Sequence, residues 1–277
     1  MRLMRMESIR LAFNFGSWKP TKQEWLLGIA CVQPEEKDRI MKFIGRLLMR
    51  KVLSEHLNVP FNKVILKRTT KGKPYLANED IESPLKDFSF NISHQGDFTV
   101  LAAQPHVAVG VDVMKTVYPS GSSTVTSFFH TMRKQFTPDE WQTIKSQEGE
   151  WKQLEIFYRH WESYVKAIGT GIGIDLQAVE FKVNTIEILP QTIVCDTQLF
   201  LNGMEMDEWM FEETKLDNLH HVAVAVGPSG KRMKDKSFRI SNFRKVPFMD
   251  IASSAIPLSP FSESDWAAFE SKRERVI

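Results

Sequence analysis

The sequence predicts an α+β fold, in which short apolar strands and amphipathic helices occur in two similar halves. Three strands are expected between Phe88 and Met114, because apolar and polar side chains alternate there with the two-residue period of a strand. Helical apolar spacing is found on both sides of this triplet. In addition, HHVAVAVGP late in the chain resembles FTVLAAQP in the triplet, since both are apolar strands that end just before proline. This weak internal repeat favours two related halves.

The composition and charge of the chain exclude several classes of protein. The 277 residues, 42% of them hydrophobic, suffice for one large core or two smaller ones. The net charge of +2 gives no overall argument for binding nucleic acid or an anionic membrane. Cys31 and Cys195 have neither the spacing of a zinc site nor that of a disulfide framework. No signal peptide or membrane span is evident, so we expect a cytoplasmic protein.

The first half is expected to contain a strand and then a long helix. The apolar run at 25–32 predicts the strand. Pro34 then stands at a favourable first helical position, and acidic residues follow it where the helix dipole favours them. Apolar spacing extends this helix to Leu57, where Asn58 ends it, and Gly45 is expected to interrupt it.

A basic turn follows this helix. The segment Arg68-Thr-Thr-Lys-Gly-Lys-Pro74 contains several cations, no acidic residue and the turn-forming residues Gly72 and Pro74. Cations combined with fixed backbone amides bind phosphate well. The segment lacks the first glycine and the Ser or Thr of a Walker motif, so it is not a P-loop. A solvated basic turn without a ligand is the alternative.

The central strands carry polar side chains at two places. The first strand ends in Asn91-Ile-Ser-His94, and the third places Gly110 and Asp112 on the face opposite its valines. Because Gly110 has no side chain, we expect space there for a ligand or metal to approach the backbone beside Asp112. The alternative is an aspartate that ends a strand at a solvated turn.

The second half is expected to contain two helices and further strands. Thr137-Pro-Asp-Glu140 is a capping box that starts the first helix. The second is expected from Glu150 to Ile168, with Glu162 and Lys166 four residues apart on its flank. By itself, that pair is a surface ion pair of small energy. Strands are predicted at 179–183, 193–200, 221–226 and 237–243, and a last helix at 262–272.

The order of these features indicates chemistry at phosphorus. A phosphate-ready loop is followed by two acidic residues, Asp112 and Glu162. Mg²⁺ is commonly held by one or two carboxylates together with substrate phosphate oxygens, so phosphoryl-type transfer is predicted. An unrelated alternative is a small anion- or RNA-binding domain built on the basic turn. It lacks the aromatic strand expected beside the cations.

Four motifs carry a resemblance to a known family. Arg68 to Pro74, Asn91 to His94, Gly110 to Asp112 and Glu162 to Lys166 resemble, in the same order, the motifs of the large 4'-phosphopantetheinyl transferases, most closely the animal type. The similarity extends from about residue 18 to residue 226. It implies two similar α+β lobes, each an antiparallel three-stranded sheet packed on a long helix, with the active site between the lobes.

The resemblance also implies domain boundaries and partners. The N-terminal lobe would comprise residues 14–105, the C-terminal lobe 106–226 and a C-terminal extension 227–277. The acceptors would be acyl carrier domains such as those of fatty acid synthase and aminoadipate-semialdehyde dehydrogenase. A monomer is expected, because the two lobes would supply the interface that a dimer supplies elsewhere.

Roles for individual residues follow from the same resemblance. Coenzyme A, the donor, would be bound by Arg39, Arg68, Thr69, Thr70, Lys71, Gly72, Lys73, Asn91, Ile92, Ser93 and His94. Asp112 and Glu162 would hold Mg²⁺, with water where some bacterial members have a second acid in place of Met114. Glu162 and Lys166 would be catalytic: Glu162 would take the proton of a carrier serine, directly or through water, as the serine attacks the β-phosphate and 3',5'-ADP leaves.

Two departures from the family pattern affect helices. About nine residues of the animal type are absent between Phe43 and Gly45, and three are absent between Trp161 and Glu162. At 1.5 Å and 100° per residue, the second loss slides one part of the helix by ~4.5 Å and rotates it by about 60°. Either the helix shifts upstream and keeps Glu162 and Lys166 in place, or the chain is a catalytically impaired protein that binds coenzyme A or a carrier. A splice form or a faulty gene model is the remaining alternative.

Overall fold

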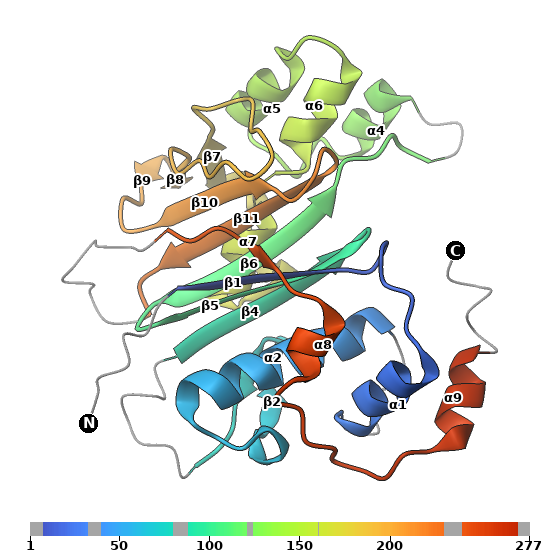
Figure 1. The fold of residues 1–277 in the computed structure, drawn as a ribbon. Coiled ribbons are helices and arrows are strands. Elements are labelled where there is room, and N and C mark those ends of the chain that lie inside the picture. The colour runs from blue at the N-terminus through green and yellow to red at the C-terminus, as the bar shows by residue number, and fades with distance from the viewer. Residues whose placement is uncertain are drawn as a thin grey trace.

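A computed structural model describes residues 8–32, 40–79, 88–120, 124–159, 161–229 and 240–270 (Figure 1). The helices are α1 (Lys22–Ala30), α2 (Ile40–Leu57), α4 (Val125–Thr131), α5 (Pro138–Lys145), α6 (Glu150–Phe157), α7 (Trp161–Ile168), α8 (Phe248–Ala252) and α9 (Glu263–Glu270). The strands are β1 (Ile9–Asn14), β2 (Leu66–Arg68), β3 (Pro74–Leu76), β4 (Phe88–Gln95), β5 (Phe98–Pro105), β6 (Ala108–Lys115), β7 (Val179–Lys182), β8 (Gln198–Leu201), β9 (Met204–Glu205), β10 (Met210–Lys215), β11 (His220–Gly227) and β12 (Arg244–Lys245). The predicted mixture of helices and small sheets is confirmed.

The two larger sheets share one connectivity. Their strand orders are β12-β1-β5-β4 and β10-β11-β6. Each contains an antiparallel hairpin, β4-β5 or β10-β11, whose second strand also pairs with an earlier strand, β1 or β6. In each, one helix, α2 or α7, comes between that earlier strand and the hairpin in sequence and packs on the sheet (Figure 1). The repeat seen in the sequence falls on β5 and β11, the strand of each hairpin that has partners on both sides.

Apolar side chains fill three layers around these sheets. Leu47 and Leu101 belong to the core between α2 and the first sheet. The two larger sheets pack on each other through a second core, to which β5, β6 and β11 contribute mainly valines. Phe211 and Ala225 pack with Ala167 in the core between α7 and the second sheet. Alternate residues of β5 and β11 therefore serve opposite layers, as the two-residue period of a strand requires.

Strands β4 and β6 lie side by side, although they form no β-ladder with each other. Instead, four alternate polar side chains of β4 accept hydrogen bonds from backbone N–H groups of β6: Ser89 from Val109 at 3.1 Å, Asn91 from Val111 at 3.1 Å, Ser93 from Val113 at 3.3 Å and Gln95 from Lys115 at 2.6 Å. These side chains satisfy N–H groups that would otherwise be buried without a partner. They also fix which residues of the two strands face each other.

Helix α1 replaces the strand predicted at 25–32, so that prediction is wrong. A capping box at 21–24 explains the difference: Thr21 Oγ1 accepts from the Glu24 N–H at 3.2 Å, and Glu24 Oε2 accepts from the Thr21 N–H at 2.8 Å. Trp25 and Ile29, four residues apart, are buried in the first core. The apolar run therefore has a helical period as well as a helix start.

Helix α2 runs from Ile40 to Leu57 without a break, and Gly45 does not divide it. A Cβ atom at Gly45 would lie 2.8 Å from Ile92 Cδ1, so the glycine lets α2 lie close to β4. Asn58 follows with a φ of 51° and ends the helix as predicted. The predicted helix start at Pro34 lies outside the described residues.

The second half differs from prediction at its long helix. Residues 150–168 form two helices, because α6 ends at Phe157 and α7 begins at Trp161. The expectation of a long helix on each sheet is therefore wrong for the second sheet, where α7 has eight residues. The first sheet has four strands instead of three, since β12 pairs in parallel with β1. The capping box that starts α5 is confirmed.

The end of the chain packs back on the first half. Strand β12 extends the first sheet, α8 packs on α2, and α9 packs on α1 (Figure 1). The ring of Phe248 stacks on that of Trp18 with centroids 5.0 Å apart. Of the strand predicted at 237–243, only residues 240–243 are described, and they are not in a strand. No helix among the described residues has the length and apolarity needed to cross a membrane.

Candidate active site

Asp112, Glu162 and Lys166 meet where β6 and α7 pack together. The Lys166 ammonium forms an ion pair with Asp112 Oδ1 and lies 3.5 Å from Glu162 Oε2. The Asp112 side chain is 5% exposed, whereas those of Lys166 and Glu162 are 30% and 40% exposed. Two carboxylates from separate elements thus share one ammonium group, at a site that solvent reaches from the helix side.

Gly110 determines how close α7 lies to β6. A Cβ atom at this position would lie 2.0 Å from the backbone oxygen of Ser163 and 2.3 Å from the backbone nitrogen of Ala167. Both distances are far below van der Waals contact, so only glycine fits. The expected space for a ligand or metal at Gly110 is therefore wrong, because the backbone of α7 fills it. The glycine instead brings Glu162 and Lys166 to Asp112.

Ser93 joins the first sheet to this cluster. Its hydroxyl donates a hydrogen bond to Asp112 Oδ1 at 2.8 Å and accepts one from the Lys166 ammonium at 3.0 Å. The residue is 5% exposed. Sequence reasoning assigned Ser93 to coenzyme A and did not suggest this contact, because the contact depends on the register between β4 and β6. The hydroxyl holds the side chains of Asp112 and Lys166 in one arrangement.

The other residues of the Asn91-His94 motif have different surroundings. The buried Asn91 side chain is engaged by the backbone of Val111, and Ile92 packs toward α2 at Gly45. His94 is exposed. Ser93 is therefore the residue of this motif that the structure places against Asp112 and Lys166.

The electrostatic environment raises the pKa of Glu162. Burial is the larger cause, and the negative charge of Asp112 adds to it, while Lys166 acts in the opposite direction. Desolvation and a neighbouring like charge both disfavour the ionised form of a carboxyl group. Glu162 is consequently a stronger proton acceptor when ionised than an ordinary glutamate, which suits a general base.

The basic loop is the turn between β2 and β3. Gly72 has a φ of +87°, its N–H donates to the Thr69 carbonyl at 2.9 Å, and the Arg68 guanidinium donates to the Gly72 carbonyl at 2.6 Å. The side chains of Arg68, Thr69, Thr70 and Lys71 are exposed. The loop thus presents exposed cations on a defined turn, as predicted. Arg39, the remaining predicted cation, lies outside the described residues.

Lys73 links this loop to the carboxylate cluster. Its ammonium donates to the Ala167 carbonyl at 2.6 Å and to the Val109 carbonyl at 3.4 Å. Burial lowers the pKa of Lys73 to about 8. A cation at the C-terminal end of α7 is favourable, because the helix dipole is negative there. The basic loop and the carboxylates are therefore held next to each other, although a long stretch of chain separates them.

A hollow of about 440 Å³ opens beside the loop. Thr69, Lys73, strand β3 and Ser89 of β4 line it. Its size is within the range of small-molecule sites in proteins. Among the residues described, no three His, Cys, Asp or Glu side chains converge to form a metal site. Asp112 and Glu162 form a two-carboxylate set, which fits Mg²⁺ when substrate phosphate and water supply the other ligands.

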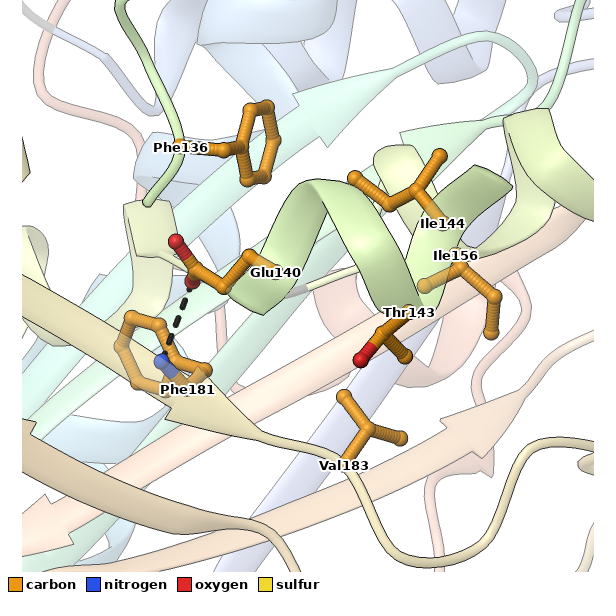
Figure 2. Close-up of a pocket in the computed structure, with 7 residues that line it drawn as sticks. All are labelled: Phe136, Glu140, Thr143, Ile144, Ile156, Phe181 and Val183. Carbon is orange, nitrogen blue, oxygen red and sulfur yellow. Dashed lines mark hydrogen bonds between the residues drawn. The ribbon is translucent and has the colours of Figure 1, made fainter. Parts of the chain in front are cut away.

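A further buried carboxylate lies between α5 and β7, in a different part of the second half. Glu140 accepts hydrogen bonds from the Phe181 N–H at 3.0 Å and the Thr137 N–H at 2.8 Å, beside a cavity of about 20 Å³ (Figure 2). Burial raises the pKa of Glu140 to about 7, although both N–H donors lower it. This carboxylate attaches α5 to β7.

Comparison with known proteins identifies the family. A family model described as 4'-phosphopantetheinyl transferase, N-terminal, matches residues 16–106, and one described as the 4'-phosphopantetheinyl transferase superfamily matches residues 108–225. The chain is 45% identical to the L-aminoadipate-semialdehyde dehydrogenase-phosphopantetheinyl transferase of Mus musculus, over 98% of this chain and 94% of that protein. The chain belongs to the 4'-phosphopantetheinyl transferase family. The resemblance inferred from the four motifs is thereby confirmed.

Other phosphopantetheinyl transferases extend the comparison. The transferase of the same description from Homo sapiens is 45% identical over 95% of this chain and 91% of its own length. A phosphopantetheinyl transferase of Thraustochytrium sp. is 37% identical over 78% of this chain. The alignment with the mouse protein spans 292 positions, which exceeds the 277 residues of this transferase. This transferase therefore lacks residues that the mouse protein has, and the losses expected after Phe43 and after Trp161 stay predictions.

Proposed function

We propose that this phosphopantetheinyl transferase moves the 4'-phosphopantetheine group of coenzyme A to a serine of a carrier domain and releases 3',5'-ADP. The meeting of Asp112, Glu162 and Lys166 beside the basic loop is the observation that carries this proposal. In this proposal the two repeated units act as two lobes, and coenzyme A lies between them. Coenzyme A, which the family uses as donor, is the donor, and acyl carrier domains are the acceptors.

The nucleotide end of coenzyme A binds at the loop. Arg68 and Lys71 are exposed and offer positive charge to the 3'-phosphate, and the turn at Gly72 presents backbone groups. Lys73 contributes by holding the loop against α7, since its ammonium is engaged by two backbone carbonyls. The pyrophosphate then reaches the carboxylate cluster, with the 440 Å³ hollow beside the loop available to the nucleotide.

The reacting groups have separate roles. Asp112 and Glu162 are the residues that would hold Mg²⁺, which when bound offsets charge on the pyrophosphate. Glu162 accepts the proton of the carrier serine, for which its raised pKa suits it. The serine oxygen forms a bond to the β-phosphorus as the bond to the bridging oxygen breaks. Lys166 offsets the charge that develops on that oxygen.

The acceptors and the assembly state follow the same proposal. The names of the mouse and human relatives include L-aminoadipate-semialdehyde dehydrogenase, and we infer that carrier domains of this kind, and of fatty acid synthase, are acceptors. We also propose that the protein acts as a cytoplasmic monomer. Both repeated units are present in one chain, and each contributes a residue, Ser93 or Asp112, to the cluster.

Transfer of fluorescent phosphopantetheine from labelled coenzyme A to purified acyl carrier protein tests the proposal. Labelling is expected with Mg²⁺ and not with EDTA. Glu162→Gln is expected to abolish labelling while coenzyme A still binds, because the base and a metal ligand are lost. Glu148→Gln is the matched control, since Glu148 is exposed and lies outside the cluster. Folded wild-type protein that binds coenzyme A but labels no carrier would instead support a non-catalytic binding protein.

A further inference from the structure

The junction between α6 and α7 is fixed by one buried arginine. Arg159 lies between the end of α6 and the start of α7, three residues before Glu162. Its side chain is 1% exposed, and its Nε lies 2.8 Å from Glu213 Oε2. Its Nη1 donates to the carbonyls of Thr185 at 3.1 Å and Ile186 at 2.9 Å. The guanidinium thus attaches the junction to β10 and to the segment that precedes β8.

Glu213, the partner of Arg159, is itself held by hydrogen bonds of its backbone and of its side chain. Glu213 exchanges backbone hydrogen bonds with Val194, at 2.9 and 2.8 Å. Its second carboxylate oxygen accepts a hydrogen bond from the Thr197 hydroxyl. Because Glu213 is also in the ladder of the second sheet, it cannot follow a movement of Arg159. The junction is therefore attached to a rigid point.

This attachment bears on Glu162 through the geometry of a helix. Successive helical residues differ by 100° in direction, so a shift of one residue at the start of α7 turns Glu162 away from Asp112. Phe157 and Trp161 belong to separate helices, so no continuous helix transmits the orientation of α6 to α7. Packing at Gly110 sets how close α7 lies to β6, and the contacts at the junction hold the residue at which the first turn of α7 begins.

We infer that Arg159 is a positioning residue, which fixes the start of α7 so that Glu162 faces Asp112. This inference rests on the proposed function of Glu162. The hydrogen-bond partners of the Arg159 side chain are Glu213, Thr185 and Ile186, not Asp112 or Lys166. Arg159 therefore acts through the position of Glu162.

The chain offers a matched control for this role. Arg10 pairs with Glu212, the neighbour of Glu213 in β10, through two bonds of 2.9 Å, and both side chains are buried. This pair joins β1 to β10, whereas the Arg159 pair joins β10 to the α6–α7 junction. Replacement of either arginine by lysine removes a buried guanidinium that bonds a glutamate of β10, through Nε and Nη2 at Arg10 and through Nε at Arg159. Only the replacement of Arg159 is expected to disturb the start of α7.

Arg159→Lys and Arg10→Lys are compared by urea unfolding, by the fluorescent transfer assay and by Mn²⁺ binding measured with electron paramagnetic resonance. Both variants are expected to lose stability. Only Arg159→Lys is expected to lower kcat, by about 10- to 100-fold, with the KM for coenzyme A within about twofold of wild type. It is also expected to weaken Mn²⁺ binding.

Equal losses of kcat in the two lysine variants would overturn the inference and leave Arg159 a purely structural residue. Glu213→Gln serves as a second variant if Arg159→Lys does not fold. Absence of transfer by the wild-type protein would instead overturn the proposed function. In that case Mn²⁺ affinity, measured without coenzyme A, still decides whether Arg159 controls the carboxylate pair.

Discussion

Replacement of Gly110 by alanine is expected to push α7 away from β6 and to remove most transferase activity. The added Cβ atom would lie 2.0 Å from the Ser163 carbonyl oxygen, where ordinary contact begins at 3.4 Å, so the helix must retreat by about 1.4 Å. The obstructing atoms belong to the backbone of α7 and cannot rotate away as a side chain could. The whole helix therefore has to move, and it carries Glu162 and Lys166 with it.

The expected magnitudes follow from this displacement. Forcing an extra carbon atom into a packed core costs about 1–3 kcal/mol of stability. Misplacement of a catalytic group by about 1 Å costs on the order of 100-fold in rate. Gly110→Ala is therefore expected to lower the free energy of unfolding by about 1–3 kcal/mol and kcat by about 100-fold. Binding of coenzyme A at the basic loop is expected to change less than kcat does.

Two other glycines calibrate the measurement. A Cβ atom at Gly173 meets no atom within 4 Å, so Gly173→Ala is expected to leave activity unchanged. At Gly45 the nearest atom is Ile92 Cδ1 at 2.8 Å, the end of a flexible side chain, so a small loss of stability is expected. Urea unfolding and the fluorescent transfer assay are run on all three variants. A Gly110→Ala protein as stable and active as Gly173→Ala would refute this packing argument.

Two further predictions concern stability. Burial raises the pKa of Glu140 from 4.5 to about 7, so between these pH values the folded state retains a proton that the unfolded state loses. The free energy of unfolding is therefore expected to fall as pH rises from 4.5 to 7, by up to about 3 kcal/mol. Glu140→Gln should abolish this fall in urea unfolding at pH 5 and pH 8, and a persisting fall would assign it to other groups. Thr21→Ala, which removes the cap of α1, is expected to cost about 1 kcal/mol, with exposed Thr70→Ala as the control. Equal unfolding of these two variants would mean that packing alone holds α1.

Short-range patterns in the sequence were sufficient for several elements. Strands β4, β5 and β6 were predicted because their side chains alternate and because Gly96 and Asp97 form a turn between the first two. The start of α5 was predicted from a capping box. The same signal was present at the start of α1 and was missed, because the apolar run that follows also suits a buried strand.

Strand β10 was missed for a different reason. Four of its six residues are polar or charged, and they show no simple alternation with apolar residues. Glu212 and Glu213 are nevertheless buried, because Arg10 and Arg159 reach them from distant parts of the chain. A buried charge is tolerated when a partner of opposite charge is supplied, and local sequence does not reveal that partner.

By itself, the sequence determined the family, the α+β class and the residues from which an active site would be built, because these depend on short motifs and on local periodicity. Only the tertiary structure decided how those residues meet. Ser93, Asp112 and Lys166 come from three elements, and their contact depends on the register of β4 on β6 and on the close approach of α7 at Gly110. Such contacts arise from packing between segments distant in sequence, which no local pattern encodes.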